Sequence, residues 1–325
     1  MIKMVNKMKK KLKNKNNIKQ YLFYSIILLI FIGLTILIAS KHEYWSDEAQ
    51  GWLIAQDASF KELFRIRCRI EGHPILYYAI IKLFQLFGLK YSGFKIISLI
   101  FSAIGIAIFL FKSKLKWYIK SLFPFTYFIF YQYAITARSY CLILPLISIL
   151  AIIWEKRKEH YLLFTIILIL MINLELYTFF LAGSIFLLEL IDYFKNKEKD
   201  KKRIIYFVVL FLSFLLTTIY LIPVSAYNVL ARNIINSSFS GAFFMPPATT
   251  KFLTILNPII TIILLLYLLF IYKKYQTKKE LMEAIIMFLP IFLFNTVIYG
   301  NLWHEGIYFL LVIFLTWIHK LDHIK

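Results

Sequence analysis

The chain has 325 residues, 61% of them hydrophobic and 18% aromatic, and its mean hydropathy is +0.72. Soluble domains are closer to half apolar, which excludes a soluble enzyme, a nucleic-acid-binding domain and a disordered chain. The net charge of +21 then indicates lysines that face anionic lipid on the cytoplasmic side of a membrane, rather than a nucleic-acid partner. The composition therefore predicts an all-α polytopic membrane protein.

The first 20 residues contain eight lysines and no acidic residue, and residues 21–39 form a continuous apolar run. This run is longer than the core of a signal peptide, and no pair of small residues follows it in the pattern of a cleavage site. We therefore expect a retained first transmembrane helix, with residues 1–20 as a basic tail in the cytoplasm.

Further apolar runs continue to the end of the chain. They cover residues 74–111, 121–137, 140–154, 161–171, 177–193, 204–222, 252–272, 281–299 and 303–318. At about 20 residues a span, these runs and the first one predict a bundle of about ten transmembrane helices. We expect a core at 21–222 that includes an outer loop at 40–73, then a second outer loop at 223–251 and C-terminal helices within 252–325.

Charge counting orients the bundle. If residues 74–111 cross the membrane twice, about 14 Lys and Arg residues lie inside and 24 outside. If the first half of that stretch is short or re-entrant, 27 lie inside, eight outside and three within the stretch. The positive-inside rule favours the second arrangement, which places both termini in the cytoplasm. The polar segments that then share the outer face are 40–73, 131–138, 173–177, 223–250 and 300–305.

The densest polar chemistry follows the first helix, where the sequence reads Trp-Ser-Asp-Glu-Ala-Gln over residues 45–50. Asp47 and Glu48 are adjacent, so on a helix they point about 100° apart and cannot face one ligand equally. One carboxylate could act as a general base for a hydroxyl while the other holds a backbone amide or a basic group. The alternative is that the pair only caps and charges the start of an interfacial helix.

A capping box at residues 59–62 predicts a short helix that ends near Gly72. Three arginines at alternate positions follow the box, the last being Arg69. An interfacial helix on the outer leaflet explains both its apolar face and these arginines. The arginines and His73 could instead hold a phosphate beside the carboxylate pair. His73 precedes a proline at a helix start, so a structural role is its alternative.

Three short motifs occur in an order that resembles a known family. They are Trp-Ser-Asp-Glu-Ala-Gln at 45–50, Glu-Gly-His-Pro-Ile-Leu-Tyr-Tyr at 71–78 and Ala-Arg-Ser-Tyr at 137–140, with a weaker echo, Trp-His-Glu-Gly, at 303–306. With the layout of residues 21–222, they resemble the GT-C glycosyltransferases, in the branch of the protein O-mannosyltransferases and lipid A aminoarabinose transferases. That family has seven spans before a large outer loop, and charge counting also places seven spans before residue 223.

The resemblance implies an inverting transfer of a sugar from a polyprenyl-phosphate carrier to a hydroxyl on the outer membrane face. Asp47 matches the family's acid that activates the acceptor, and Glu48 matches the second acid of that pair. His73 matches a His-Pro helix start and Arg138 a basic residue of the cavity. We expect these two residues, with Arg69, to bind the donor phosphate.

The chain departs from that family in its second half. The loop at 223–250 is too short for the soluble domain of the protein mannosyltransferases, and many relatives continue beyond the tenth span. The acceptor could therefore be a lipid, a glycan or a protein. A transporter or flippase of lipid-linked saccharides is the alternative function, and a scaffold without catalysis is a third. A transporter usually carries broken helices in two related halves, whereas here the acids cluster in one loop and no repeat is found.

Several further residues near the outer ends of helices are expected to line the substrate cavity. They are Gln50, Tyr77, Tyr140, Glu175, His304 and Glu305. Structural alternatives exist for several of them: Glu175 could be an ordinary turn acid, and the tyrosines could pack between helices or lie in the interface belt. Arg138, which lies beside them in the sequence, could snorkel outward.

No cofactor is predicted. Asp47, Glu48 and His73 are suitable ligands for a hard or borderline metal, but no closely spaced set enforces a site, and the family branch it resembles works without metal. Cys68 and Cys141 lie far apart and belong to no paired motif, so they indicate neither a disulfide framework nor a thiolate zinc site. The expected partners are the polyprenyl-phosphate-linked sugar donor, its acceptor and membrane lipids.

Overall fold

The computed structural model describes residues 2–196, 200–222, 266, 277–295 and 304–320. Within these ranges every regular element is a helix, as the composition predicts. The expected loop at 223–251 lies outside the described residues. So do the expected span at 252–272, apart from Leu266, and the last part of the one at 281–299.

Five helical segments in the described part are long and apolar enough to cross a membrane. They are Ile18–Ala39, Tyr91–Lys112, Ser139–Lys156, Leu176–Lys195 and Lys201–Leu221. Shorter apolar helices cover Leu76–Leu86, Tyr161–Ile172 and Gly306–His319. The described part of the chain is thus all-helical and of the multi-pass membrane type, and the number of ten crossings stays a prediction.

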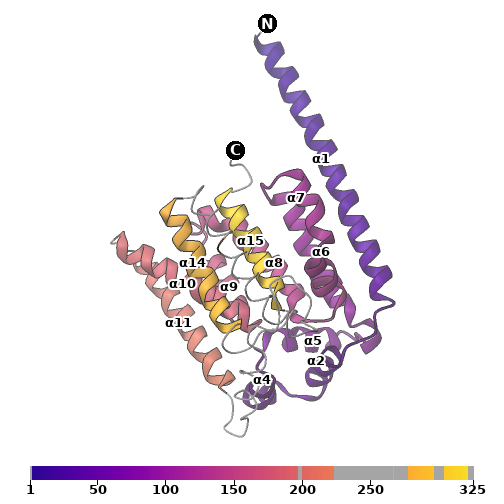
Figure 1. Ribbon diagram of the computed structural model, residues 1–325, viewed down its shortest axis with the longest axis vertical. Helices are drawn as coiled ribbons and strands as arrows, with labels where there is room; N and C mark the ends of the chain where they lie inside the picture. Colours follow the sequence, from indigo (N-terminus) through magenta and orange to yellow (C-terminus); the bar gives the residue numbers. More distant parts are fainter. Residues whose placement is uncertain (1, 197–199, 223–265, 267–276, 296–303, 321–325) are drawn as a thin grey trace.

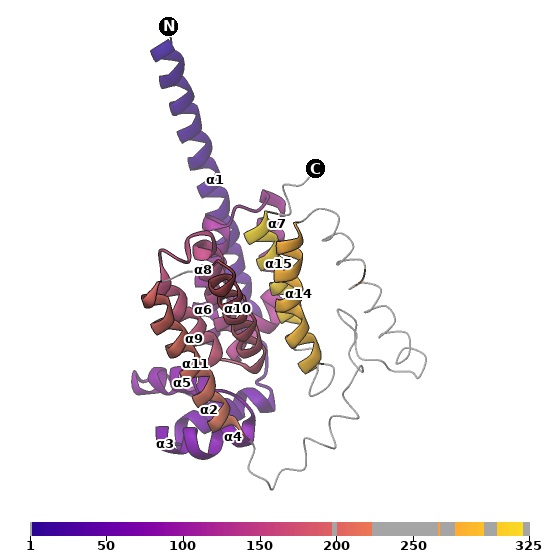
Figure 2. The same ribbon diagram turned by 90° about the vertical axis from the view of Figure 1, so that its left-hand side faces the viewer.

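The helices form a bundle that has different structures at its two ends (Figures 1 and 2). At one end, which we call the loop end, the short helices α2 (Ser46–Asp57), α4 (Cys68–Glu71) and α5 (Leu76–Leu86) lie across the bundle. At the opposite end, the tail end, α1 (Ile2–Ala39) begins and α15 (Gly306–His319) ends. The first helix of the described chain therefore begins at the same end of the bundle at which the last helix finishes.

The remaining helices make up the body of the bundle. They are α6 (Lys95–Lys112), α7 (Trp117–Leu122), α8 (Ile143–Ile153), α9 (Tyr161–Ile172), α10 (Leu176–Lys195), α11 (Lys201–Leu221) and α14 (Lys278–Leu293). α6 packs on α1 and α8, while α9 packs on α8, α10 and α11. α14 packs on α10 and α15. Their facing sides form one continuous apolar core.

α6 and the start of α8 approach closely at Gly105. A Cβ atom at this position would lie 2.7 Å from Cγ of Leu144 and 2.9 Å from the backbone nitrogen of Pro145. Only glycine fits at this position, because any Cβ atom would collide with α8. Small residues commonly allow such close approach of the backbones of membrane helices. The contact fixes the chain that leads into α8, which also carries part of the site.

The stretch 74–111 contains one helix long enough to span. α5 has 11 residues, which is about 16 Å of helix and roughly half of a hydrocarbon core. The chain then turns through Gly88, whose φ of +87° favours glycine, and a single turn of 3₁₀ helix at Tyr91–Gly93. This geometry is compatible with the single crossing that charge counting favours.

The run at 121–137, expected as one continuous span, is broken into short pieces. α7 is followed by a 3₁₀ turn, Phe123–Phe125, and by a π-helical segment, Phe128–Ile135. Pro124 lacks a backbone N–H, and Thr126 is extended with a ψ of 150°, so the α-helix cannot continue. Backbone that departs from a regular α-helix is tolerated at membrane depth where protein surrounds it. The broken run meets this condition, because most of its π-helical segment is buried.

The capping box at 59–62 begins a helical segment, as predicted. Ser59 accepts a hydrogen bond from the backbone of Glu62, whose carboxylate bonds the backbone of Ser59 in return. The segment continues as α3 (Phe60–Glu62), a π-helical turn (Leu63–Arg67) and α4, and it ends at Gly72 with a φ of +67°. Its exposed apolar side chains are Phe60, Phe64, Ile66 and Ile70.

Buried charges pair at the tail end. The carboxylate of Glu189 accepts hydrogen bonds from Arg157, Tyr161 and Arg203. Glu189 and Arg203 are almost wholly buried, and a buried carboxylate needs such partners because its desolvation is costly. These contacts join α9, α10 and α11 on the side away from the loop end.

Candidate active site

A cavity of about 170 Å³, lined by residues of the short helices, opens at the loop end of the bundle. Its walls come from α2, from the chain around α4 and α5, and from the segments that lead into α8 and α10. The lining residues are Asp47, Gln50, Gly51, Glu71, His73, Pro74, Tyr77, Tyr78, Arg138, Ser139, Leu174 and Glu175. All three sequence motifs of the first half of the chain therefore contribute to one cavity.

Eleven residues were expected at the site, and six of them line this cavity. The six are Asp47, Gln50, His73, Tyr77, Arg138 and Glu175. The structure brings them together from positions up to 128 residues apart (175 − 47), because the short helices cross the bundle at the point where α8 and α10 begin. The other five lie outside the cavity lining.

Asp47 and Arg138 form an ion pair in the cavity lining. Arg138 donates from Nη1 to Oδ2 of Asp47 over 2.6 Å, and the Asp47 side chain is 60% exposed whereas that of Arg138 is 17% exposed. Burial opposes ionisation of Asp47, but the hydrogen bond and the charge of Arg138 outweigh it and lower the pKa of Asp47 below its usual value. The carboxylate is thus ionised and accessible.

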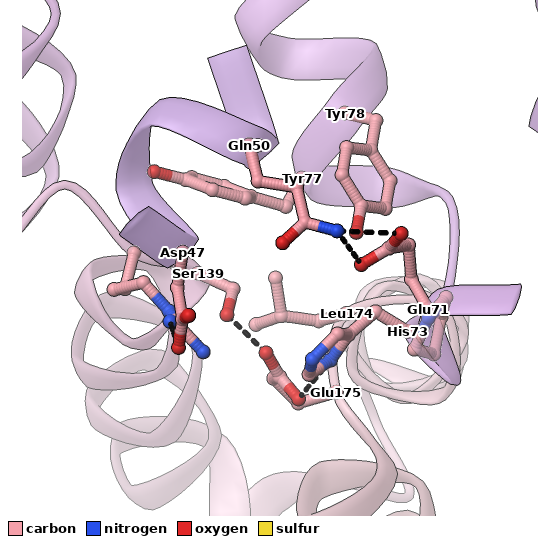
Figure 3. A pocket seen from close by; sticks show the side chains of 12 residues that line it. Asp47, Gln50, Glu71, His73, Tyr77, Tyr78, Ser139, Leu174 and Glu175 are labelled. Carbon is pink, nitrogen blue, oxygen red and sulfur yellow. Dashed lines mark hydrogen bonds and ion pairs between the residues drawn. The ribbon is translucent and has the colours of Figure 1, made fainter. Parts of the chain in front are cut away.

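Glu175 lies deeper, at the N-terminus of α10, between two lining residues (Figure 3). Its Oε1 accepts a hydrogen bond from Oγ of Ser139, and its Oε2 is 3.1 Å from Nδ1 of His73. Burial opposes ionisation of Glu175, but His73, Ser139 and Arg138 together lower its pKa to about 2. For His73, burial lowers the pKa, and the neighbouring Glu175 carboxylate more than reverses that effect.

Gln50 and Glu71 form a second polar pair on the wall formed by α2 and α4 (Figure 3). Nε2 of Gln50 lies 2.9 Å from both carboxylate oxygens of Glu71. A carboxylate only accepts hydrogen bonds, so Glu71 fixes the amide nitrogen toward itself. The carbonyl oxygen of Gln50 is left as an acceptor for a ligand that donates hydrogen bonds.

Tyr77 forms part of the cavity wall from α5. The residue is 7% exposed, and its hydroxyl is buried with no hydrogen-bond partner among the described residues. Buried polar groups are normally satisfied. Because the hydroxyl has almost no accessible surface, Tyr77 contributes its ring rather than its hydroxyl to the cavity wall.

Glu48 points away from the cavity, contrary to the expectation that it belongs to the reacting pair. It is fully buried, and its Oε2 accepts hydrogen bonds from the backbone of Trp45 at 2.7 Å and is 2.9 Å from Nε2 of His42. Its other oxygen accepts a hydrogen bond from the backbone of Ala137. Glu48 is thus used in tying the start of α2 to the chain before Arg138.

Four other expected residues also lie outside the cavity lining. Arg69 donates to the backbone carbonyls of residues 219 and 220 at the end of α11. Tyr140 is buried behind Arg138, whose guanidinium carbon is 5.7 Å from its ring centroid. His304 and Glu305 are buried at the start of α15. Burial lowers the pKa of His304 to about 3, so its imidazole is neutral.

Several lining residues were not expected from the sequence. Glu71 and Ser139 have polar contacts with lining residues, and Leu174 adds an aliphatic wall. Glu71 and Ser139 lie inside the motifs at 71–78 and 137–140, which was the only available signal. Among the described residues, no group of three or more His, Cys, Asp or Glu side chains is placed to hold a metal ion.

Comparison of the chain with models of known protein families, with curated proteins and with solved structures finds no match. The function of the site is therefore inferred from its geometry and from the motifs that form it.

Proposed function

We propose that the chain is an inverting glycosyltransferase that moves a sugar from a polyprenyl-phosphate carrier to an acceptor hydroxyl on the outer face of the membrane. The observation that carries the proposal is the meeting of Asp47, His73 and Arg138, one from each motif, at one cavity. An accessible carboxylate and two basic side chains thereby share a site beside an apolar bundle. The resemblance of these motifs to the GT-C glycosyltransferases favours the same reaction.

Arg138 and His73 suit the phosphate of the donor. An Arg guanidinium binds phosphate oxygens through paired N–H donors, and such charge-assisted hydrogen bonds are among the strongest in proteins. The prenyl chain would stay in the membrane next to the helices, whose outer surfaces are apolar. A soluble protein offers no such surface, so a lipid-linked donor fits this chain better than a nucleotide sugar.

Asp47 is the proposed general base. Its carboxylate takes the proton of the acceptor hydroxyl while that oxygen forms a bond to the anomeric carbon of the sugar. The bond from that carbon to the phosphate oxygen breaks, and both of its electrons leave with the phosphate. Arg138 and the protonated His73 stabilise the negative charge that develops there. One displacement of this kind inverts the anomeric carbon.

The pair of Asp47 and Arg138 has to separate during such a reaction. In a single displacement the base and the leaving group lie on opposite sides of the anomeric carbon, whereas the two side chains are bonded at 2.6 Å. The donor phosphate competes with Asp47 for Arg138. Once Arg138 is taken by phosphate, the carboxylate loses the contact that lowers its pKa and becomes a stronger base. Donor binding therefore precedes activation of the acceptor.

The size and lining of the cavity suit a single sugar residue. A volume of about 170 Å³ is more than ten times the roughly 10–15 Å³ that one water molecule needs on the same measure, so the cavity has room for a small molecule such as a monosaccharide. The carbonyl of Gln50 and the carboxylate of Asp47 offer acceptors for sugar hydroxyls, and Tyr77 and Tyr78 offer aromatic walls. A lipid, a glycan or a protein could present the acceptor hydroxyl at the open side.

The proposal predicts a sugar whose attachment depends on Asp47. Surface glycans and lipids of cells with and without the chain are compared by mass spectrometry, and the purified protein is then assayed with polyprenyl-phosphate sugars and the acceptor so identified. Asp47→Asn should reduce the transfer rate by about 10²–10⁴-fold, because the general base is lost. Asp57→Asn is the matched control, since Asp57 is an exposed acid of the same helix outside the cavity.

Full activity of Asp47→Asn in this assay would remove Asp47 from the mechanism. A transporter of lipid-linked saccharides would also change the surface glycans, but purified in detergent it would catalyse no transfer at all. Absence of transfer by the folded wild-type protein with every polyprenyl-phosphate sugar would therefore reject the enzyme.

A further inference from the structure

Glu175 is the most deeply buried acid of the cavity lining, at 2% exposure. Its two oxygens face different partners, Ser139 on one side and His73 on the other. A hydroxyl supplies a hydrogen bond but no charge. A carboxylate in such surroundings therefore relies on nearby cations, and the one in direct contact is the imidazole of His73.

The contact also determines what the second nitrogen of His73 can do. Nδ1 lies against the carboxylate, which only accepts hydrogen bonds, so Nδ1 carries a proton. In the neutral ring Nε2 is then an acceptor, and in the charged ring it is a donor. The side chain of His73 is 32% exposed and lines the cavity, so a ligand there meets an acceptor or a cationic donor according to the charge of the ring.

Titratable groups surround His73 on every element packed against it. They are Glu175 before α10, Glu71 of α4, Asp47 of α2, Arg138 before α8 and His304 before α15. The three acids favour a charged imidazole and Arg138 opposes it, while His304 is neutral. Burial also opposes the charge, and the net effect of all these groups is a raised pKa of His73.

We propose that Glu175 is a positioning residue that holds His73 as a cation, with Nε2 as a donor, so that His73 and Arg138 together bind a lipid phosphodiester. The inference rests on the proposed function and adds a regulation to it, because the donor site is complete only while His73 is protonated. Below the pKa of His73 both groups bind the anion. As the pH rises through that pKa, Nε2 becomes an acceptor and repels the phosphate oxygens.

The charge of His73 is measured directly by NMR of the full chain with labelled histidine. The chain contains six histidines, and His73→Gln assigns the signal of interest. Glu175→Gln keeps the size and the hydrogen bond to Ser139 but removes the negative charge, so the midpoint of the His73 titration should fall by at least about one pH unit. Glu43→Gln, which removes an exposed acid of the loop end outside the cavity, should leave the midpoint unchanged.

Binding is measured with dihexadecyl phosphate in detergent, a lipid phosphodiester whose single charge is constant between about pH 5.5 and 9. At about pH 7, Glu175→Gln should bind it about tenfold more weakly than the wild type, and acidification should restore most of the loss. A residue that only supported the fold would show no such recovery. Dimethyl phosphate, which lacks the lipid chains, should show the same pH midpoint with lower affinity.

An unchanged titration of His73 in the folded Glu175→Gln protein would overturn the inference, as would binding that is weak at every pH. The proposed function would stand in either case if sugar transfer still required Asp47. Conversely, a wild-type protein that binds no phosphodiester at any pH would reject the proposed donor as well.

Discussion

Asp47 and Glu48 are neighbours in the chain, but their carboxylates have different surroundings. Asp47 is largely exposed and forms an ion pair with Arg138 in the cavity lining. Glu48 is fully buried and accepts hydrogen bonds from the backbone of Trp45 and Ala137. A rotation of about 100° along a helix separates them, so one acid is available to a ligand while the other supports the loop that carries Arg138.

This difference predicts that replacing each acid by its amide has unequal effects on the stability of the protein. Glu48→Gln should lower the free energy of unfolding by about 1–3 kcal/mol, because its new N–H₂ group would face buried N–H donors. Asp47→Asn should change it by less than about 0.5 kcal/mol, since the side chain is exposed. Thermal unfolding in detergent, followed by tryptophan fluorescence, measures both. Equal melting temperatures of the two variants would contradict the assigned roles.

At the scale of elements, the cavity exists because short helices cross the loop end and lie against the ends of the longer helices of the bundle. α5 is too short to span, and the start of α8 is held by its close contact with α6 at Gly105. Arg138 and Ser139 lie just before this contact. The geometry of the site thus depends on a helix crossing that contains none of its residues.

Gly105→Ala tests that dependence. The added methyl group would lie within 3 Å of Leu144 and of the backbone of Pro145, so the helices have to move apart at a cost of about 1–3 kcal/mol. We expect a lower melting temperature and, because Arg138 shifts, slower sugar transfer. Gly33→Ala on α1 is the control, since nothing lies within 4 Å of its Cβ position. A Gly105→Ala protein as stable and active as this control would show that the crossing tolerates displacement.

At the scale of the whole molecule, the start of α1 and the end of α15 share the tail end, and the cavity occupies the loop end. The lysine-rich start of the chain then predicts that the tail end is cytoplasmic and that the cavity is outside. A lipid-linked sugar would have to be exposed on the outer leaflet before this site could use it.

Cysteine labelling in intact cells tests this orientation. Cys68 and Cys141 are buried, so they give little background with a membrane-impermeant maleimide. Asp57→Cys at the loop end should be labelled from outside, whereas Lys156→Cys at the tail end should react only after the membrane is opened. Both positions are exposed. The reverse pattern would place the cavity in the cytoplasm and reject an outer-face reaction.

Much of the site was predictable because its residues lie in short motifs beside apolar runs. The capping box at Ser59 and the stop at Gly72 depend only on local hydrogen bonds and backbone angles, so their residue types were sufficient. The break at Pro124 was missed because an apolar run looks continuous in composition even where its backbone turns. The pairing of His73 with Glu175 was also missed, since it joins residues 102 positions apart.

The sequence by itself determined the class of protein, its apolar runs and the set of polar segments from which a site could be built. These follow from hydrophobicity and charge, which are properties of residue types and need no partner. Only the tertiary structure decided that Asp47 faces the cavity and Glu48 does not, and that Ser139 and His73 share the carboxylate of Glu175. Burial and hydrogen bonding depend on which distant segments pack together, and helix crossings such as the one at Gly105 determine that packing.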